Sequence, residues 1–390
     1  MRKLLRIVFV LFTTATFAQA GHIMQGVGAV NMSMGGAATA MPLDISGAMQ
    51  WNPATLSAFN GKILDFSIGA FSSSPELSSS YGPMSGITKD DRGISPMPAI
   101  GFVWGKEGSK STFGVSAFGI SGFGVTFPEN LNYPQDLQGN PNPNFNPNEP
   151  VNPISFPQHA GGFGHIESDY MLMQISLSWS YEISKGFSIG IQPNINYGAL
   201  ELAPNPLASP SMTLGYPESD KATAIGFGGQ VGLFYASEGG IKLGASYKTA
   251  QSFSDFDFSN TSLDGSAAPD VAFQMDYPAI ISLGVGYSTE VLDITVDYRN
   301  VDYSSTAGFE AKGWAIAESG PMTGFPTGSV KGFGWKDVNI VSAGLQLKVV
   351  NKLPIRFGYT YSSNPIDNEL AFFSIPATAV IKNAFQFGLG

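Results

Sequence analysis

The chain has 390 residues with 20 Lys+Arg and 30 Asp+Glu, so its formal net charge is −10. Charged residues make up 13% of the chain, against roughly 25% in an average soluble domain. The absence of cysteine excludes disulfides, Cys-based metal sites and a thiol nucleophile, and the acidic balance argues against nucleic acid as a partner. The composition is typical of a chain whose outer surface faces something other than water.

Residues 1–20 have the layout of a secretory signal peptide. Two basic residues precede an apolar stretch that reaches Phe17, and Ala18-Gln19-Ala20 forms an A-x-A cleavage site. The stretch is too short for a membrane-spanning helix, which needs about 20 apolar residues. We therefore expect the mature chain to begin at Gly21 and exclude the leader from the fold.

Residues 21–60 lack any two-residue period and are rich in small residues, with Met, Ala, Leu and Trp among them. A periplasmic tail would be more polar, so we interpret this segment as a hatch, or plug, inside the lumen of the structure that follows. Asn52-Pro53-Ala54 would form the turn into the first strand, because Pro53 fixes its own φ and keeps Asn52 out of a helix. Five apolar residues would line the path of a ligand: Met24, Val27, Met32, Met34 and Trp51.

Beyond residue 60, apolar residues recur at every second position. For example, Ile294, Val296 and Tyr298 alternate with Thr295 and Asp297. Successive side chains of a strand point to opposite faces, so each such segment has one apolar face and one polar face. Twelve segments follow this pattern: 62–72, 97–105, 111–124, 169–183, 187–199, 223–236, 241–250, 278–288, 291–303, 338–349, 354–362 and 380–390.

A soluble β-sandwich and a membrane barrel would both use such strands, and three features favour the barrel. The strands are long enough for a tilted membrane strand, about 9–11 residues, and many apolar stripes end in Tyr or Trp, as interfacial girdles do. Short and long connections alternate strictly, as in outer-membrane barrels. The sequence therefore predicts an all-β, transmembrane antiparallel β-barrel. The pattern places Trp104, Trp179 and Tyr235 outward and Asp65, Gln174 and Arg356 inward.

Several motifs along the mature chain occur in a characteristic order. They are Gly35-Gly36-Ala37, Asp44 and Asn52-Pro53-Ala54 before the first strand, Gly226 to Tyr235, Leu243-Gly244-Ala245-Ser246-Tyr247, Pro278 to Tyr287, and Phe357-Gly358-Tyr359-Thr360-Tyr361 ahead of Asn364-Pro365-Ile366. In this order the chain resembles the FadL family of outer-membrane transporters for long-chain fatty acids and other hydrophobic compounds. The resemblance implies fourteen strands around an N-terminal hatch, and a ligand that leaves sideways through the wall near the third strand.

The barrel would occupy residues 61–390, and its last visible strand stops at Gly390 without the terminal aromatic residue that usually closes a bacterial barrel. Twelve strands are visible where the resemblance implies fourteen. We therefore expect the sequence to be truncated at its C-terminus by roughly two strands, with an unpaired seam between the first and the last visible strand.

Glycines and charges inside the expected barrel offer candidate site residues. The third strand contains Gly114, Gly119, Gly122 and Gly124, and glycine in a strand marks a bulge or bend. These glycines would either form the wall opening or make room for the plug. Arg299 and Arg356 point inward; they would either pair with aspartates in a charge ladder or receive a fatty-acid carboxylate through a bidentate contact.

The sequence and the resemblance together indicate a monomeric barrel in the outer membrane of a Gram-negative-type bacterium, surrounded by lipid and lipopolysaccharide. We expect it to import hydrophobic molecules passively, long-chain fatty acids or hydrocarbons, by loop capture, hatch rearrangement and lateral exit. A general polar porin and a structural or adhesin barrel are the alternatives. No strand-borne His lies beside a Ser-rich face and no phosphate-binding loop is present, so the sequence predicts no enzyme, no cofactor and no metal site.

Overall fold

The computed structural model describes residues 19–348, 353–378 and 381–390. Most of the expected signal peptide, residues 1–18, lies outside the described residues. The last residue of the expected strand 338–349 and the first residue of 380–390 also lie outside them.

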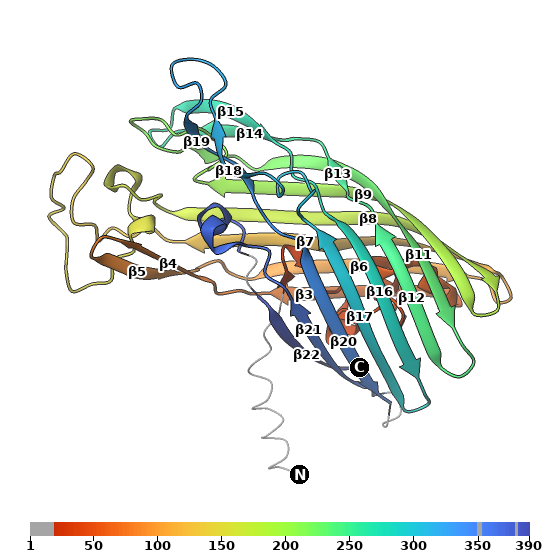
Figure 1. Cartoon of the computed structure of the whole chain (residues 1–390). Coiled ribbons are helices and arrows are strands. Elements are labelled where there is room, and N and C mark those ends of the chain that lie inside the picture. The colour runs from red at the N-terminus through yellow and green to blue at the C-terminus, as the bar shows by residue number, and fades with distance from the viewer. Residues whose placement is uncertain (1–18, 349–352, 379–380) are drawn as a thin grey trace, which may run out of the picture.

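Twelve long antiparallel strands form the wall (Figure 1). Each one pairs with its neighbour in the order of the chain, and each coincides with one of the twelve expected strands, so this prediction is confirmed. The strands are β3 (Gly61–Phe71), β6 (Ser95–Gly105), β7 (Ser111–Phe127), β8 (Ile166–Ser184), β9 (Phe187–Ala203), β11 (Ala222–Ala236), β12 (Ile241–Lys248), β16 (Ala279–Ser288), β17 (Leu292–Asp302), β20 (Val338–Leu347), β21 (Ile355–Ser362) and β22 (Asn383–Leu389).

The two faces of the wall follow the predicted alternation. Trp104, Trp179 and Tyr235 have exposed side chains on the outer face, whereas Gln174 and Arg356 are buried on the inner face. A one-residue shift in register would have exchanged the two faces, so the predicted orientation is confirmed. The outer face carries the exposed apolar side chains that a lipid-facing surface requires.

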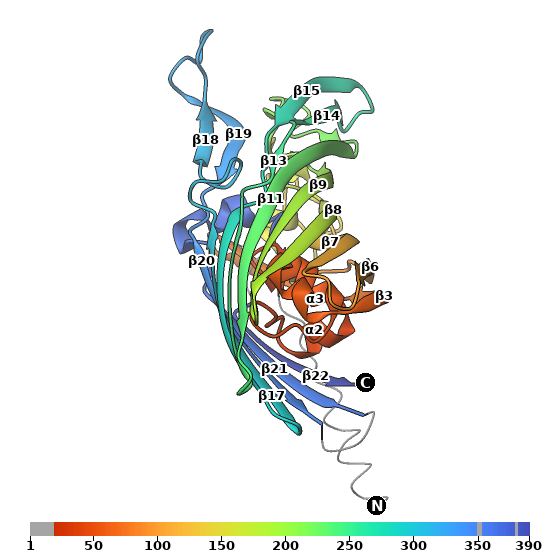
Figure 2. The ribbon, with the colours of Figure 1, turned by 90° about the vertical axis from the view of Figure 1, so that its right-hand side faces the viewer.

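The wall curves around an interior segment, and β3 and β22 are its two ends (Figure 2). Within the described residues no strand pairing joins these two ends. This agrees with the expected unpaired seam, while the truncation itself stays a prediction.

Short turns join the strands at one end of the wall and long connections join them at the other (Figure 1). The sequence indicated only loops in the long connections, but the structure places further short elements in them. These include the hairpins β4–β5 and β18–β19 and the three-stranded sheet β10–β14–β15. Their bounds are β4 (Glu76–Tyr81), β5 (Met84–Lys89), η3 (Pro153–Ser155), η4 (Gln158–Ala160), β10 (Glu218–Ser219), β13 (Ser252–Phe253), β14 (Phe256–Thr261), β15 (Ala267–Phe273), β18 (Lys312–Ile316), β19 (Pro326–Phe333) and η5 (Asn368–Ser374).

The segment before the wall forms a plug inside the lumen, as expected (Figure 2). It contains β2 (Ile23–Met24), α2 (Ala29–Ser33), α3 (Ile45–Trp51) and the 3₁₀ helix η2 (Pro53–Ala58), and every residue of α3 is buried. Asp65 on β3 accepts a hydrogen bond of 2.6 Å from Ser46 in α3, which confirms that it points inward. The short β1 (Gln19–Ala20) pairs with β2 and lies within the expected signal peptide. Across the parts of the chain that are described, no helix is long and apolar enough to cross a membrane.

Candidate functional site

The Asn52-Pro53-Ala54 tripeptide fastens the plug to the wall. The side-chain amide of Asn52 donates to the carbonyl oxygens of Thr39 (2.8 Å) and of Leu233 on β11 (2.9 Å), and its oxygen accepts from the Ala54 N–H (3.1 Å). Ser180 on β8 donates to the Ala54 carbonyl at 2.8 Å. The tripeptide begins the helix η2 rather than leading directly into β3, so the expected turn into the first strand is displaced by one short helix.

A second set of contacts fastens the other side of the plug. One Nη atom of Arg299 donates to Asp297 and to the carbonyl of Gly36, each at 2.7 Å. The same Asp297 oxygen accepts from the backbone N–H groups of Ala38 (2.9 Å) and Thr39 (2.8 Å). Arg299 therefore lies in an ion pair with Asp297 that also contacts the plug, and its role as a carboxylate receptor stays a prediction.

Trp51 completes this anchor, since the Arg299 guanidinium lies 3.7 Å from its ring centroid. Such a cation–π contact gains strength where both groups are buried, and both side chains are almost fully buried here. Arg299 thus contacts the plug directly through its hydrogen bond to Gly36 and its stacking on Trp51, and indirectly through Asp297, which accepts from Ala38 and Thr39.

Arg356 lies at the other end of the wall, near the short turn before β21. Its Nε donates to Gln346 at 2.6 Å, and Gln346 in turn donates to Asp293 at 2.7 Å. Lys348 is paired with the same aspartate at 3.0 Å. The two arginines that the sequence offered as carboxylate receptors therefore lie in separate networks and do not form one site.

The apolar plug residues pack between the plug and the wall. Met24, Val27, Met34 and Trp51 are buried, whereas Met32 is partly exposed. Met34 rests against Gly344 of β20, where a Cβ atom would come within 2.7 Å of its methyl group. These side chains fill the lumen, and their role as a ligand path stays a prediction.

The strand β7 contains a β-bulge. Its register with β8 shifts between Gly119 and Ser121, and Ile120 and Ser121 are both buried. The inward side of β7 therefore changes from even-numbered to odd-numbered residues at this point, as expected when one extra residue is inserted into a strand. The plug strand β2 meets the wall here, because Ile23 pairs with Ser121.

The four glycines of β7 differ in their surroundings. At Gly114 a Cβ atom would come within 2.8 Å of the Met49 sulfur in the plug, and at Gly122 within 2.9 Å of a β8 carbonyl. The Arg92 guanidinium occupies the space beside Gly124, whereas no atom lies within 4 Å of a Cβ at Gly119. Gly114 thus makes room for the plug, and Gly119 belongs to the bulge.

At the extracellular end of the plug, His22 is enclosed by a shell of aromatic rings. Its imidazole stacks on Phe309 with 4.9 Å between centroids, and five further rings lie within 6.4 Å. Complete burial lowers the pKa of His22 to about 3, so the imidazole is neutral. We call this group the His22 cage; it consists of His22, Phe123, Tyr170, Tyr277, Tyr303, Phe309 and Trp335.

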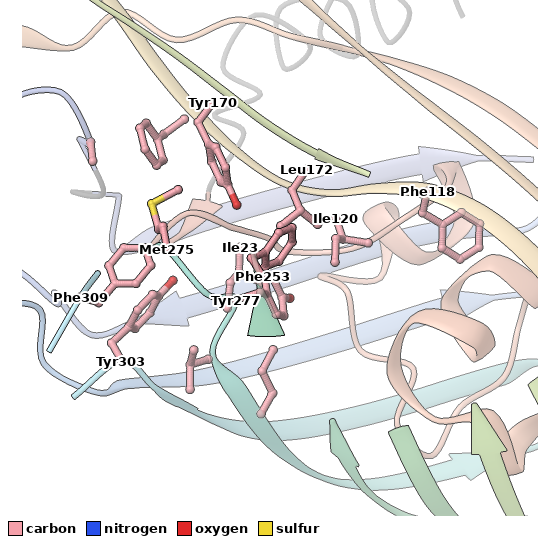
Figure 3. Close-up of a cluster of buried hydrophobic side chains, with 14 of the residues drawn as sticks. Ile23, Phe118, Ile120, Tyr170, Leu172, Phe253, Met275, Tyr277, Tyr303 and Phe309 are labelled. Atoms are coloured by element: carbon pink, nitrogen blue, oxygen red, sulfur yellow. The ribbon is translucent and has the colours of Figure 1, made fainter. Parts of the chain in front are cut away.

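The cage joins parts of the chain that are far apart in sequence. Tyr170 comes from β8, Phe123 from β7 just beyond the bulge, and the others from long connections. Figure 3 shows Tyr170, Tyr303 and Phe309 at one end of the buried apolar cluster, with Phe118 at the other end. The cage therefore lies between the extracellular connections and the bulge.

A small apolar cleft opens among the extracellular connections. It is lined by Phe163, Ile166, Pro204, Pro206, Tyr216, Trp314, Val330, Phe372, Phe373, Ile375 and Pro376.

Comparison with known proteins identifies the architecture. Residues 156–388, more than half of the chain, match the family model described as outer membrane protein transport protein (OMPP1/FadL/TodX). The chain belongs to this family. It is accordingly an outer-membrane β-barrel of a transport family, as the motifs predicted. No curated protein sequence matches the chain.

Three solved structures illustrate the similarity of the fold. The Ralstonia pickettii toluene transporter TbuX has a TM-score of 0.61 at 18% identity, covering 87% of each chain. The Pseudomonas putida toluene transporter TodX has a TM-score of 0.61 at 19% identity, covering 94% of this chain and 88% of that one. A Pseudomonas aeruginosa FadL homologue has a TM-score of 0.63 at 14% identity, covering 90% and 82%.

The sequence reasoning did not find the His22 cage. No motif of the sequence contains His22, and its ring partners lie up to 313 positions away. The inward row of β17 does point toward the His22 cage. Its inward residues Asp297, Arg299 and Val301 are followed by Tyr303 at the next inward position. On β8, Tyr170 is the third inward residue from the extracellular end, after Ile166 and Ser168.

Proposed function

We propose that this family member carries small hydrophobic molecules passively across the outer membrane as a monomer. Aromatic hydrocarbons are the first substrate class and long-chain fatty acids the second. A molecule is captured at the apolar cleft, passes the His22 cage and leaves sideways at the β7 bulge into the lipid around the wall. The toluene transporters TodX and TbuX, which share this fold, support the aromatic class.

The observation that carries this proposal is the unequal fastening of the plug. Asn52, Asp297 and Arg299 hold its body through several buried hydrogen bonds. By contrast, β2 forms one ladder pair with the wall, Ile23 opposite Ser121 at the bulge, and the carbonyl of the preceding His22 accepts from the Ser121 hydroxyl (2.8 Å) and the Gly122 N–H (3.1 Å). On this proposal the end of the plug leaves β7 by breaking these contacts while the body remains seated, and that movement uncovers the wall only where its ladder is already interrupted.

The filled lumen favours this route over the alternatives. A general polar porin needs a water-filled channel, but α3 and the start of η2 are buried against the wall. A structural or adhesin barrel has no need for a closed aromatic cage beneath an apolar cleft. An apolar molecule that cannot pass an anchored plug has the bulge as its nearest way out.

A reversible covalent lock tests the mechanism. The chain has no cysteine, so Ile23→Cys with Ser121→Cys introduces one possible disulfide between two Cα partners, at a separation that disulfides tolerate. Cells that carry this variant should take up labelled toluene only when the disulfide is reduced. The oxidised variant should take up less than a tenth of the amount taken up by the wild type.

A matched control places the lock elsewhere. Val296→Cys with Ala343→Cys joins two other Cα partners, on β17 and β20 in the outer face of the wall, and should leave uptake unchanged in both states. Equal toluene uptake by the oxidised and reduced forms of the β2–β7 variant would refute release of the plug at the bulge.

A further inference from the structure

The ladder between β6 and β7 stops partway along the wall. Its last pair toward the extracellular end is Ala99 opposite Phe118, although β6 pairs with β3 as far as Ser95 and β7 pairs with β8 as far as Phe127. Within the described residues, no ladder pair joins residues 95–98 of β6 to β7. From the bulge upward, one edge of β7 therefore lacks β6 as its neighbour.

Two prolines explain why the ladder stops there. Residues 95–98 of β6 read Ser95-Pro96-Met97-Pro98. The residues of an antiparallel strand bond alternately to one neighbouring strand and to the other. Because the ladder to β3 continues unbroken through both prolines, their nitrogens, which carry no hydrogen, lie on the side of β7. Before Ala99, β6 thus has no N–H donor to offer β7.

A single proline has a smaller effect elsewhere in the wall. Pro193 of β9 pairs with Gly229 of β11, so its nitrogen lies on the side of β8. The ladder between β8 and β9 lacks the pairs between Ser176–Asn194 and Trp179–Ile191, and it is present on both sides of this gap. One missing donor interrupts a ladder, whereas two missing donors in succession coincide with the end of the ladder between β6 and β7.

The plug strand β2 occupies the edge of β7 that β6 leaves. At the bulge, Ile23 of β2 pairs with Ser121. Leu172 of β8 pairs with the same serine from the other side, so β2 stands on the side of β6. Without the bulge, the register of β6 would place Pro96 opposite Ser121. The strands β2 and β6 therefore compete for one position on β7, and the prolines disable β6.

We propose that Pro96 and Pro98 are positioning residues that reserve this edge of β7 for the plug. An unpaired strand edge is a template for pairing, so β6 with N–H donors at both positions would extend its ladder along β7 and displace β2. The longer ladder would then keep the wall closed at the bulge, because separating several pairs in lipid leaves their backbone groups unsatisfied. This consequence for transport rests on the proposed function, whereas the competition between β2 and β6 does not.

Two disulfide reporters in the purified full-length protein test the competition. Ile23→Cys with Ser121→Cys reports that β2 lies on β7. Met97→Cys with Ile120→Cys reports an extended β6 ladder, since the continued register of β6 places these two residues opposite each other. With both prolines present, the first disulfide should form nearly completely and the second hardly at all.

Restoring the donors should reverse these yields. Pro96→Val with Pro98→Val should lower the yield of the β2–β7 disulfide about fivefold and make the β6–β7 disulfide the main product, because β6 then pairs along the edge. Pro96→Ala with Pro98→Ala should act in the same direction, since it restores the same two N–H groups with a smaller side chain. Pro193→Val is the matched control, because this proline also lies exposed on the outer face of the wall; both yields should be unchanged.

The outcomes separate this proposal from the proposed function. Uptake of labelled toluene should fall about fivefold in both β6 variants, because the wall stays paired at the bulge, and should be unchanged in Pro193→Val. Melting temperatures of the β6 variants should equal or exceed that of the wild type. Unchanged disulfide yields, or loss of the first disulfide without gain of the second, would overturn the role of the prolines and leave the proposed function intact. Reversed yields with wild-type uptake would support that role and count against release at the bulge.

Discussion

Asn52 is the most sharply testable anchor of the plug. Its fully buried side chain makes three hydrogen bonds, to the Thr39 and Leu233 carbonyls and from the Ala54 N–H. Each is worth about 1 kcal/mol net, so Asn52→Ala should weaken the seating of the plug by about 3 kcal/mol. Because 1.4 kcal/mol is a factor of ten, the unseated population should rise roughly a hundredfold.

The conservative variant Asn52→Asp separates the contributions of the individual bonds. It keeps the oxygen that accepts from Ala54 but loses the two N–H donors to Thr39 and Leu233. Its effect should lie between those of the wild type and Asn52→Ala. Asn148→Ala, in an exposed connection, removes a side chain of the same type and serves as the control.

Conductance in planar lipid bilayers measures unseating directly. Wild type and Asn148→Ala should stay closed to ions, while Asn52→Ala should show frequent openings and Asn52→Asp fewer. Limited proteolysis of residues 21–60 should follow the same order. Wild-type conductance together with wild-type protection in Asn52→Ala would show that the plug does not depend on this tripeptide.

Three further predictions concern β7, the plug and the outer wall. Gly114→Val should cost about 1–3 kcal/mol by overpacking against Met49 and Leu56, whereas Gly119→Val, which faces open space, should leave the melting temperature unchanged. Burial, reinforced by the charge of Asp65, raises the pKa of Asp44 from 3.8 to about 7. Between about pH 4 and 7 the folded chain therefore binds more protons than the unfolded chain. The free energy of unfolding should fall as pH rises through this range. Melting curves should show this slope in the wild type and not in Asp44→Asn. Arg92→Ala removes a partly exposed ion pair with Asp169. The free energy of unfolding should therefore fall by less than about 1 kcal/mol, while proteolysis near residue 91 should become faster. Lys185→Ala removes an exposed ion pair with Glu238 and should change neither quantity.

The wall could be predicted because its signal is local. In every wall strand one face meets lipid and the other meets the lumen, so the period of two survives along the whole strand. The β7 bulge escaped this reasoning, because Gly119-Ile120-Ser121-Gly122 reads equally well as an unbroken strand. Only the register with β8 reveals that the inward row changes parity there.

The site could not be predicted in the same way, because its contacts are long-range. His22 and Tyr303 are 281 positions apart, and Asn52 and Leu233 are 181 apart. No periodic pattern links such residues. The sequence could present Arg299 as either a ladder member or a ligand receptor, but only the position of Gly36 and Trp51 decides that it holds the plug.

A segment outside the wall meets β7 just above the bulge. Asp91 N–H donates to the Thr126 carbonyl (2.8 Å), and Thr126 N–H donates to the Asp90 carboxylate (2.6 Å). Arg92 then crosses Gly124 to reach β8, where it donates to the Ser168 carbonyl (2.8 Å) and to Asp169. Gly124 permits this crossing because any Cβ there would occupy the position of the guanidinium.

The bulge therefore lies between two sets of contacts. Inside, β7 meets the plug through the Ile23–Ser121 pair and through two hydrogen bonds to the His22 carbonyl. Outside and above, the strap of residues 90–92 ties β7 to β8 through four hydrogen bonds. If β2 leaves, the strap still prevents β7 and β8 from separating toward their extracellular ends, so an opening would be confined to the few residues around Gly119. A confined opening suits a single aromatic ring and keeps the rest of the ladder paired, which a wall in lipid requires. On the proposed route, the strap limits the size of the molecule that leaves at the bulge.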